Sequence, residues 1–192
     1  MKALITGYPG TGKSSIAQVL KEKGHAAYDI EAMPGYMHAV DIETGVRSKL
    51  PSPVPRHWFD NVGAYDWDTE KIRQLLSAHE DIFICALADN QEQLYTSFDI
   101  IFLLLLDEIE MENRLLSRET TSYGKDQGEL ADILLNHHHF EKSLLDLGAY
   151  PINTTHALPE IVNEILIHAT LPASRDQLNR LNYTFPCNDY GI

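Results

Sequence analysis

The sequence predicts an α/β fold in which a five-stranded parallel sheet carries helices on both faces. Short apolar segments alternate five times with segments of helical periodicity, which is typical of parallel strands joined by crossover helices. Residues 81–87 are almost entirely apolar, as expected of a strand that is buried on both faces. The chain has 192 residues, of which 44% are hydrophobic and 22% charged, and this suffices for one domain with a sizeable core.

The first strand is predicted at residues 2–6, and a glycine-bearing loop follows it directly. This loop, residues 7–14, reads GYPGTGKS and fits the pattern G-x-x-x-x-G-K-[ST] of a phosphate-binding loop. Helical periodicity then runs over residues 13–23 and is predicted to end at Gly24. Because the motif requires the order strand, loop and helix, we interpret the segment as a P-loop rather than an ordinary glycine-rich turn.

The residue types of this loop suit nucleotide binding. Glycines let successive backbone N–H groups point at phosphate oxygens, and the helix adds its positive N-terminal end. We expect Lys13 to reach the β- and γ-phosphates and the Ser14 hydroxyl to bind Mg²⁺. The other predicted nucleotide-binding residues are Gly10, Thr11, Gly12 and Ser15.

A short second strand at residues 25–28 ends in two acidic residues, Asp29 and Glu31. Ligands of open α/β sheets bind outside the carboxyl ends of the strands. If the chain turns at this point, both carboxylates border that pocket. The alternative is a solvated acidic turn.

Residues 33–67 form the least regular part of the sequence, because their prolines and glycines interrupt both helix and strand. The segment concentrates cations and aromatic residues, including Arg47, Arg56 and Tyr65. Such side chains suit an anionic or ring-bearing substrate, so we predict a binding region here. The alternative is a surface excursion with a small satellite core around its two tryptophans.

Asp68 is predicted to cap a helix whose apolar face repeats over residues 72–76. The third strand, at residues 81–87, is followed at its carboxyl end by Asp89. This position makes Asp89 a candidate substrate-binding residue. It also allows Asp89 to be no more than the cap of the short helix that leads to Tyr95.

The fourth strand, at residues 98–106, closes with Asp107 and Glu108, which is also the form of an ATPase Walker B element. In the following helix, Arg114 and Arg118 are four residues apart and are expected on one face, next to a polar loop at residues 120–126. An arginine pair beside a mobile loop suits closure over a triphosphate. The alternative is a solvated helix flank.

A long helix is predicted from Gly128 to Gly148, and it contains three consecutive histidines at 137–139. Consecutive helical residues point about 100° apart, so the three cannot converge on one metal ion. We therefore expect His137 at the edge of the core and the other two in solvent. A fifth strand at 150–154 and a helix over 158–169 follow, and the tail 171–192 shows little periodicity.

The composition excludes several classes of function. A net charge of −13 repels phosphate backbones, which argues against non-specific nucleic-acid binding. Two cysteines, Cys85 and Cys187, form no disulfide framework, so we expect a reducing cytoplasm. We expect no signal peptide, because the P-loop begins at Gly7, and no membrane span, because the longest apolar run covers only residues 100–106.

The order of these features resembles the adenylate-kinase-like and shikimate-kinase-like P-loop kinases over residues 1–168. The resemblance implies a three-layer P-loop NTPase fold with strand order 2-3-1-4-5, formed by one domain over residues 1–170. It also implies an acceptor-binding region at 33–67 and a lid at 118–128, with no role for 171–192.

The resemblance further assigns roles to the acids and marks departures from the family. Asp29 matches the acid near Mg²⁺, and Glu31 matches the acid near the acceptor hydroxyl. Nucleotide-monophosphate kinases carry Asp-Gly-x-Pro-Arg after the third strand and shikimate kinases carry three glycines there, whereas this chain reads ADNQ at 88–91. The acid pair favours a hydroxyl-bearing acceptor, because a carboxylate can orient a hydroxyl and accept its proton.

The sequence thus predicts a kinase that transfers the γ-phosphoryl group of ATP, with Mg²⁺, to a small molecule. The predicted catalytic residues are Lys13, Asp29, Glu31, Arg114 and Arg118. The predicted substrate-binding residues are Asp29, Glu31, Arg47, Arg56 and Asp89, and the predicted Mg²⁺ ligands are Ser14 and, through water, Asp29.

Three other functions fit parts of the sequence. One is a nucleotide-monophosphate kinase. Another is an ATPase whose Walker B acid is Asp107 or Asp89. The third is a nucleotide-binding protein in which Asp29 and Glu31 have no catalytic role. The sequence indicates neither the acceptor nor the oligomeric state.

Overall fold

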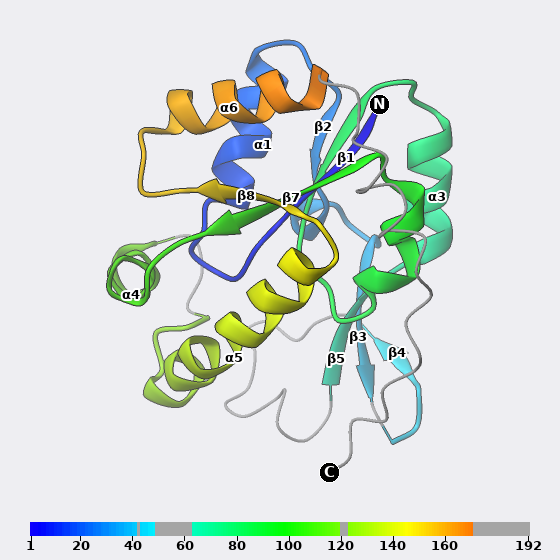
Figure 1. Cartoon of the computed structure of the whole chain (residues 1–192). Helices are drawn as coiled ribbons and strands as arrows, with labels where there is room; N and C mark the ends of the chain where they lie inside the picture. Colours follow the sequence, from blue (N-terminus) through cyan, green and yellow to red (C-terminus); the bar gives the residue numbers. More distant parts are fainter. Residues whose placement is uncertain (42, 49–62, 120–122, 171–192) are drawn as a thin grey trace.

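A computed structural model describes residues 1–41, 43–48, 63–119 and 123–170. These residues form a central parallel sheet with helices on both faces, and a smaller antiparallel sheet beyond the carboxyl ends of two of its strands (Figure 1). In the part of the chain so described, no helix is long and apolar enough to cross a membrane.

The central sheet has the order β2-β6-β1-β7-β8, and all of its strand pairs are parallel. Its strands are β1 (Lys2–Thr6), β2 (Ala27–Asp29), β6 (Ile82–Cys85), β7 (Ile100–Leu105) and β8 (Tyr150–Asn153). Counted along the chain within this sheet, the order is 2-3-1-4-5, as the sequence predicted. β1 lies in the middle, and its Leu4 pairs with Ile84 on one side and Ile101 on the other. The P-loop therefore leaves the sheet at its centre.

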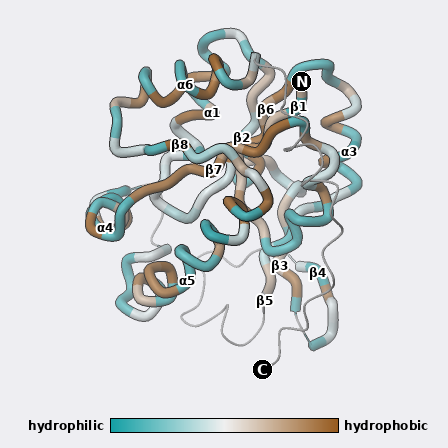
Figure 2. The backbone as a smooth tube through the Cα atoms, in the orientation of Figure 1, coloured by the Kyte–Doolittle hydropathy of each residue, from teal (hydrophilic) through white to brown (hydrophobic). Residues whose placement is uncertain are grey.

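Two hydrophobic clusters cover the two faces of this sheet, because successive strand residues point to opposite sides. On one face, Ala3 and Ile5 pack with the helices α1 (Lys13–Glu22) and α6 (Leu158–Thr170). On the other face, Leu4 packs with α3 (Thr69–Ser77), the 3₁₀ helix η2 (Gln91–Ser97) and α5 (Gln127–Asp146). Figure 2 shows the apolar strands enclosed between helices whose outer sides are polar. The predicted three-layer architecture is thus confirmed.

A third cluster joins α4 (Glu108–Ser117) to α5 beside the P-loop. Met111 and Leu115 of α4 are fully buried against Ile133, and Tyr8 of the P-loop packs on the same cluster. Asp68 caps α3 as predicted, because its side chain accepts a hydrogen bond from Lys71 N. Asp107, which was not predicted as a cap, accepts one from Glu110 N at the start of α4.

The segment predicted to be irregular contains a three-stranded antiparallel sheet of order β4-β3-β5. Its strands are β3 (Met37–Asp41), β4 (Arg47–Ser48) and β5 (Gly63–Trp67), and they follow the 3₁₀ helix η1 (Ile30–Ala32). The expectation of an irregular segment was wrong here because these strands are short, and β5 pairs with β3 across a long stretch of sequence. No run of alternating residues is long enough to indicate them.

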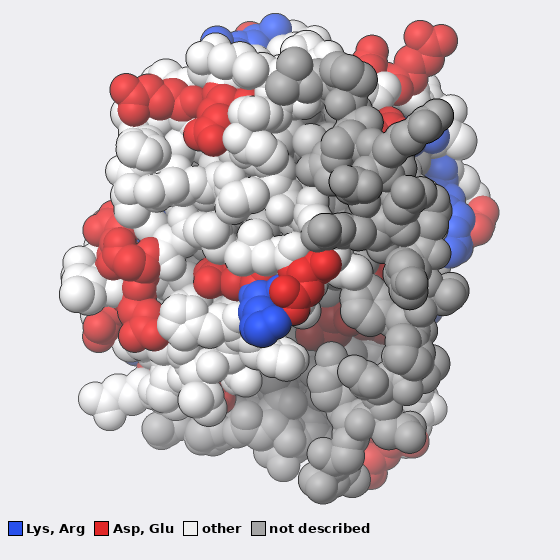
Figure 3. All heavy atoms as spheres, in the orientation of Figure 1, with Lys and Arg blue, Asp and Glu red and all other residues white. Residues whose placement is uncertain are grey.

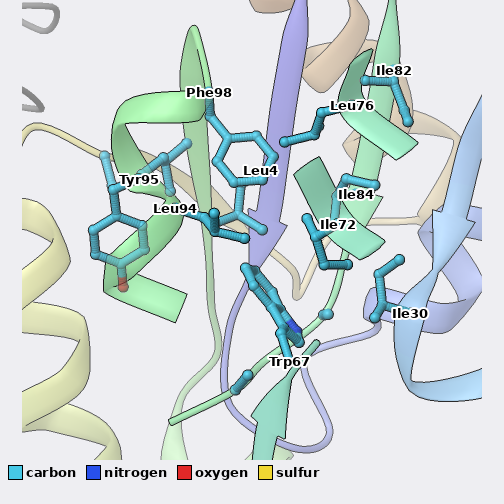
Figure 4. Packing of buried hydrophobic residues seen from close by; sticks show 14 of the residues in the cluster. Leu4, Ile30, Trp67, Ile72, Leu76, Ile82, Ile84, Leu94, Tyr95 and Phe98 are labelled. Atoms are coloured by element: carbon cyan, nitrogen blue, oxygen red, sulfur yellow. The ribbon is translucent and has the colours of Figure 1, made fainter. Parts of the chain in front are cut away.

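β5 anchors this small sheet in the main core. Trp67 is fully buried and belongs to the same cluster as Leu4, Ile72 and Leu94. Figure 4 shows its ring lying beside these side chains. Trp67 is therefore part of the main core and not of a satellite core, while Trp58 lies outside the described residues.

Candidate active site

The P-loop connects β1 to α1 in a conformation that needs its glycines. Gly12 is the N-cap of α1 with φ 99°, and Gly10 has φ 91°, a region that other residues rarely adopt. A Cβ on Gly7 would lie 2.8–2.9 Å from Thr11 Oγ1 and from backbone and side-chain atoms of Leu104. Thr11 closes the turn, because its backbone N–H and its hydroxyl both donate to the carbonyl of Tyr8, at 3.3 and 2.8 Å.

Lys13 is only 8% exposed, and its ammonium group lies inside the curve of the loop. Its Nζ donates to the Gly7 carbonyl at 2.7 Å and to the Tyr8 carbonyl at 3.4 Å. A carboxylate oxygen of Glu31 lies 3.7 Å from the same Nζ. The buried cation is thus balanced by loop carbonyls and one acid. Ser14 and Ser15, the next two residues, are exposed to solvent.

Glu31 reaches this position from η1, just beyond the carboxyl end of β2. Its Oε1 also accepts a hydrogen bond from the backbone N–H of Leu87 at 3.1 Å, which fixes the carboxylate beyond the end of β6. Leu87 is 56 residues away in the sequence. The sequence placed Glu31 at a strand end; the fold brings it to the P-loop lysine.

Asp29 ends β2 and pairs with Cys85 of β6. Burial raises the pKa of the Tyr65 hydroxyl, and the carboxylates of Glu31 and Asp29 raise it further. Burial likewise raises the pKa of the Cys85 thiol, and Asp29 adds to that effect. Asp29, Glu31, Lys13 and Tyr65 therefore share one electrostatic environment at the carboxyl edge of the sheet.

Asp89 and Asn90 attach the small sheet to the main one. Asp89 Oδ2 accepts from the Tyr65 N–H at 2.5 Å, and the Asp89 N–H donates to the Tyr65 carbonyl at 3.1 Å. Asn90 Oδ1 accepts from the Trp67 N–H at 2.8 Å, and its Nδ2 donates to the Trp67 carbonyl at 3.1 Å. The alternative of Asp89 as a helix cap was wrong: the N-cap of η2 is Asn90, and no side chain caps this helix.

Neighbouring acids influence Asp89. Displacement of water raises the pKa of its carboxyl, the Tyr65 hydrogen bond opposes this, and the charge of Asp66 raises the pKa again. The pKa of Glu92 is also raised, by loss of water and then by Asp66 and Asp89. The region between the two sheets is thus rich in carboxylates.

The two predicted arginines do not share a helix face, which corrects the sequence prediction. α4 ends at Ser117, and Arg118 is its C-cap in an extended conformation with ψ 143°. Arg114 Nε donates to Glu110 at 2.8 Å, and its NH2 group donates to the Thr154 carbonyl at 2.8 Å. These contacts hold Arg114 against the end of β8.

Arg118 instead turns toward the lid segment. Its NH2 group donates to the Tyr123 carbonyl at 2.5 Å, and its buried Nε has no partner among the described residues. Burial lowers the pKa of Arg118, while the nearby charge of Glu31 raises it. Of the two arginines, Arg118 is the one that the structure brings toward Glu31.

The described part of the predicted lid, residues 118–119 and 123–128, packs against α4 and α5. Gly124 is buried, its N–H donates to Glu129 Oε2 at 2.8 Å, and a Cβ there would lie 3.1 Å from Ile133 and Leu115. Whether this segment moves on ligand binding stays a prediction.

The predicted site residues also include Arg47 and Arg56. Arg47 is an exposed residue of β4, and its charge lowers the pKa of Asp66 against the stronger effect of burial. Arg56 lies outside the described residues. Asp107, considered above as a Walker B acid, uses one carboxylate oxygen to cap α4.

Sequence reasoning missed two residues of the site as individual candidates. Tyr65 was included only as an aromatic residue of the predicted binding region, and β5 is too short to reveal its direction. Gln91 is 2% exposed, and its Oε1 accepts from the Thr6 hydroxyl at 3.1 Å, so it supports the strand that leads into the P-loop. A single buried glutamine belongs to no periodic pattern by which the sequence could reveal it.

No protein-family model matches the sequence, and no curated protein matches it. Solved structures do match. Deoxyadenosine kinase from M. mycoides with bound dATP is 15% identical, with 89% of this chain and 100% of that chain covered and a TM-score of 0.55. The same kinase with its products dCMP and dCDP gives 15% identity, 88% and 98% coverage and a TM-score of 0.50. A gluconokinase from Sinorhizobium meliloti 1021 gives 17% identity, 90% and 93% coverage and a TM-score of 0.49. The chain thus has the P-loop kinase fold of the deoxyadenosine kinase.

Proposed function

We propose that the protein is an ATP-dependent kinase that phosphorylates a hydroxyl group of a small molecule. One observation carries the proposal: the Glu31 carboxylate lies 3.7 Å from the ammonium group of the P-loop lysine, Lys13. A carboxylate fixed beside the phosphate-binding cation can contact an acceptor hydroxyl at the point where this hydroxyl meets the γ-phosphate. A protein that only binds nucleotides has no need of an acid at this point.

The reaction assigned to this site is an in-line displacement. The acceptor oxygen forms a bond to the γ-phosphorus while the bond to the bridging oxygen of ADP breaks. Glu31 orients the acceptor hydroxyl and accepts its proton. Lys13 exchanges the loop carbonyls for phosphate oxygens and neutralises the charge that moves onto ADP.

Two oxygen donors at the site suit Mg²⁺, which prefers such ligands and keeps several waters. The exposed hydroxyl of Ser14 at the start of α1 and the carboxylate of Asp29 at the end of β2 are the residues that would hold it. Bound there, the ion would neutralise the β- and γ-phosphates.

Arg118 is the second cation of the proposed site. Its guanidinium donates to the Tyr123 carbonyl, and its Nε, which has no partner among the described residues, can donate to an anionic group. In this proposal it stabilises the transferring phosphoryl group when the segment 118–128 closes over the nucleotide. Arg114 supports it by holding the end of α4 against Thr154.

The acids around the small sheet favour a neutral or cationic acceptor over a phosphate. The charges of Asp29 and Glu31 act on Tyr65, and burial together with neighbouring acids raises the pKa values of Asp89 and Glu92. A phosphate acceptor would add further negative charge. The fold shared with deoxyadenosine kinase makes nucleosides a natural first class to test, and we further infer a cytoplasmic location from the composition.

The test is to incubate the protein with Mg-ATP and a metabolite pool that includes nucleosides and sugars, and to search by mass spectrometry for a new phosphate ester. We expect one ester that depends on ATP and disappears with Lys13→Ala. Release of inorganic phosphate that is independent of any acceptor would overturn the proposal in favour of an ATPase. A product phosphorylated on an existing phosphate would favour a nucleotide-monophosphate kinase.

A further inference from the structure

Outside the P-loop, one group of side chains from two helices has the composition of a metal site. Glu108 begins α4, and His137 and His138 lie in the middle of α5. One ligand atom from each of these three residues lies within 4.8 Å of the other two. Glu108 and His138 are exposed, so the group is open to solvent on one side. His137 is buried and forms the other side of the group.

The protonation of His137 follows from its contacts. The residue is 0% exposed, and its Nδ1 lies 2.9 Å from the Leu134 carbonyl. A carbonyl oxygen only accepts, so Nδ1 carries the hydrogen and Nε2 carries a free lone pair. This Nε2 is buried and has no partner among the described residues. A buried polar atom without a partner is costly, and metal-binding histidines commonly donate their other N–H to a carbonyl.

His138 also has one ring nitrogen toward the group and the other toward a supporting oxygen. Its Nε2 lies 2.9 Å from Glu108 Oε1, and its Nδ1 lies 3.6 Å from Glu141 Oε2. The other oxygen of Glu141, Oε1, is buried and without a partner in the described part of the chain. One nitrogen of His138 therefore faces the possible ligand Glu108, and the other faces a supporting carboxylate, as in carboxylate–histidine–zinc triads.

The rings of the three consecutive histidines do not all point in different directions. The ring centroids of His137 and His138 are 3.9 Å apart with an angle of 36° between the planes, so both rings turn to the same side of α5. His139 is exposed and is not part of the group. Three consecutive histidines do not converge, but two of them meet a carboxylate from another helix.

We propose that Glu108, His137 and His138 bind a divalent transition metal ion of the Zn²⁺ class. Two imidazole nitrogens and one carboxylate oxygen suit Zn²⁺ and similar ions rather than Mg²⁺ or Ca²⁺, which prefer oxygen ligands. The fourth position would be taken by water. This inference is independent of the proposed kinase activity.

Such an ion would connect two helices beneath the P-loop. His137 and Phe140 pack against Tyr8, with ring centroids 6.3 and 5.3 Å away. The Tyr8 carbonyl accepts hydrogen bonds from Thr11 and Lys13. The bound metal would therefore stabilise the contact between α4 and α5 on which this part of the P-loop rests.

The test is calorimetric titration of the full chain with Zn²⁺, without nucleotide. We expect one saturable site. Glu108→Gln and His138→Ala should each weaken Zn²⁺ binding at least about tenfold, whereas the neighbouring His139→Ala should bind like the unaltered chain. Zn²⁺ should raise the unfolding temperature of the unaltered chain and His139→Ala far more than that of the other two variants.

Because His137 is buried and its replacement can unfold the chain, Co²⁺ serves as a second probe. The visible absorption of Co²⁺ bound to the unaltered chain should show a nitrogen-bearing site of low coordination number, and this spectrum should be lost in His138→Ala. The proposal is overturned if the unaltered chain binds no Zn²⁺ saturably, if Glu108→Gln and His138→Ala bind it normally, or if His139→Ala loses as much affinity as His138→Ala.

Discussion

The two sides of the candidate site are built in different ways. On the nucleotide side, the contacts that shape the P-loop join residues three to six apart, such as Thr11 with Tyr8 and Lys13 with Gly7. On the proposed acceptor side, Asp89 binds Tyr65 and Asn90 binds Trp67, pairs that are 24 and 23 residues apart. The P-loop is therefore shaped by contacts between neighbouring residues. The other side is held together by side chains that bind segments distant in the sequence.

This difference determines how substitutions on each side of the site affect ligand binding. A loop made of backbone N–H groups presents the same groups to any triphosphate, so its chemistry is general. An interface made of side chains can change its residues and with them its ligand. Figure 3 shows a face on which acidic side chains are widespread and basic ones confined to a few places, in line with the net charge of −13. Variants on each side should therefore affect different quantities.

The largest expected effect is on the nucleotide side. Lys13→Ala should lower phosphoryl transfer about 10³-fold, because a preorganised charge at the transferring group is lost. Circular dichroism should show an intact fold, and steady-state kinetics should show the loss. Lys21→Ala, an exposed lysine on the same helix, is the control. Normal turnover in Lys13→Ala would remove the basis of the kinase proposal.

Glu31 stands where the two sides meet, so its variant tests whether they act together. Glu31→Gln keeps an oxygen for the Leu87 N–H but removes the charge and the proton acceptor. We expect transfer to fall about 10²-fold with ATP affinity nearly unchanged. Glu22→Gln on α1 is an exposed control. Equal loss of binding and transfer would mean that Glu31 acts only on the nucleotide side.

The same difference explains which parts of the molecule the sequence could predict. The central sheet, the helix cap at Asp68 and the P-loop depend on local patterns, and the structure confirms the elements predicted from them. The sequence also placed Glu31 at a strand end, but only the fold reveals its distance from Lys13. The small sheet was missed because its strands are short and β5 pairs with β3 across a long separation. The common face for Arg114 and Arg118 was wrong because α4 ends at Ser117, one residue before Arg118.

On the acceptor side, Asn90→Ala should reduce stability rather than chemistry. The change leaves the Trp67 N–H and carbonyl without their side-chain partners in a buried place, which we expect to cost about 2–3 kcal/mol. Denaturant unfolding measures this loss, and the control is Asn136→Ala, whose amide only contacts Asp132 on an exposed helix surface. A loss no larger than that of the control would show that β5 does not depend on this contact.

A smaller effect is expected at the predicted lid, where variants of Arg118 and Arg114 should change different quantities. Arg118→Ala should lower kcat about tenfold with less change in ATP affinity, because the charge that it stabilises is greatest in the transition state. Arg118→Lys should recover only part, since lysine lacks the planar fork. Arg114→Ala should instead lower stability, because its partners are Glu110 and the Thr154 carbonyl. Unchanged kcat in Arg118→Ala, with hydrogen exchange over residues 118–128 that ignores ligand, would refute the lid.

The smallest expected effect is a pH dependence at Asp89. Loss of water and the charge of Asp66 raise the pKa of this carboxyl in the folded chain, although the residue keeps contact with solvent. A carboxyl whose pKa is raised by folding stabilises the fold when protonated, and this contribution is lost as the pH rises through the folded pKa. Asp89→Asn removes the titration but keeps an oxygen that can accept from the Tyr65 N–H.

We therefore expect the free energy of unfolding of Asp89→Asn, relative to the unaltered chain, to be higher at pH 7 than at pH 4. Urea unfolding at several pH values measures this difference, with Asp81→Asn as an exposed control at the opposite end of β6. The effect should be smaller than that of Asn90→Ala, because solvent still reaches the Asp89 carboxylate. A relative stability of Asp89→Asn that falls between pH 4 and pH 7 would mean that the hydrogen bond from Tyr65 outweighs the loss of water. Asp89 would then belong with Asn90 as a purely stabilising contact of the acceptor side.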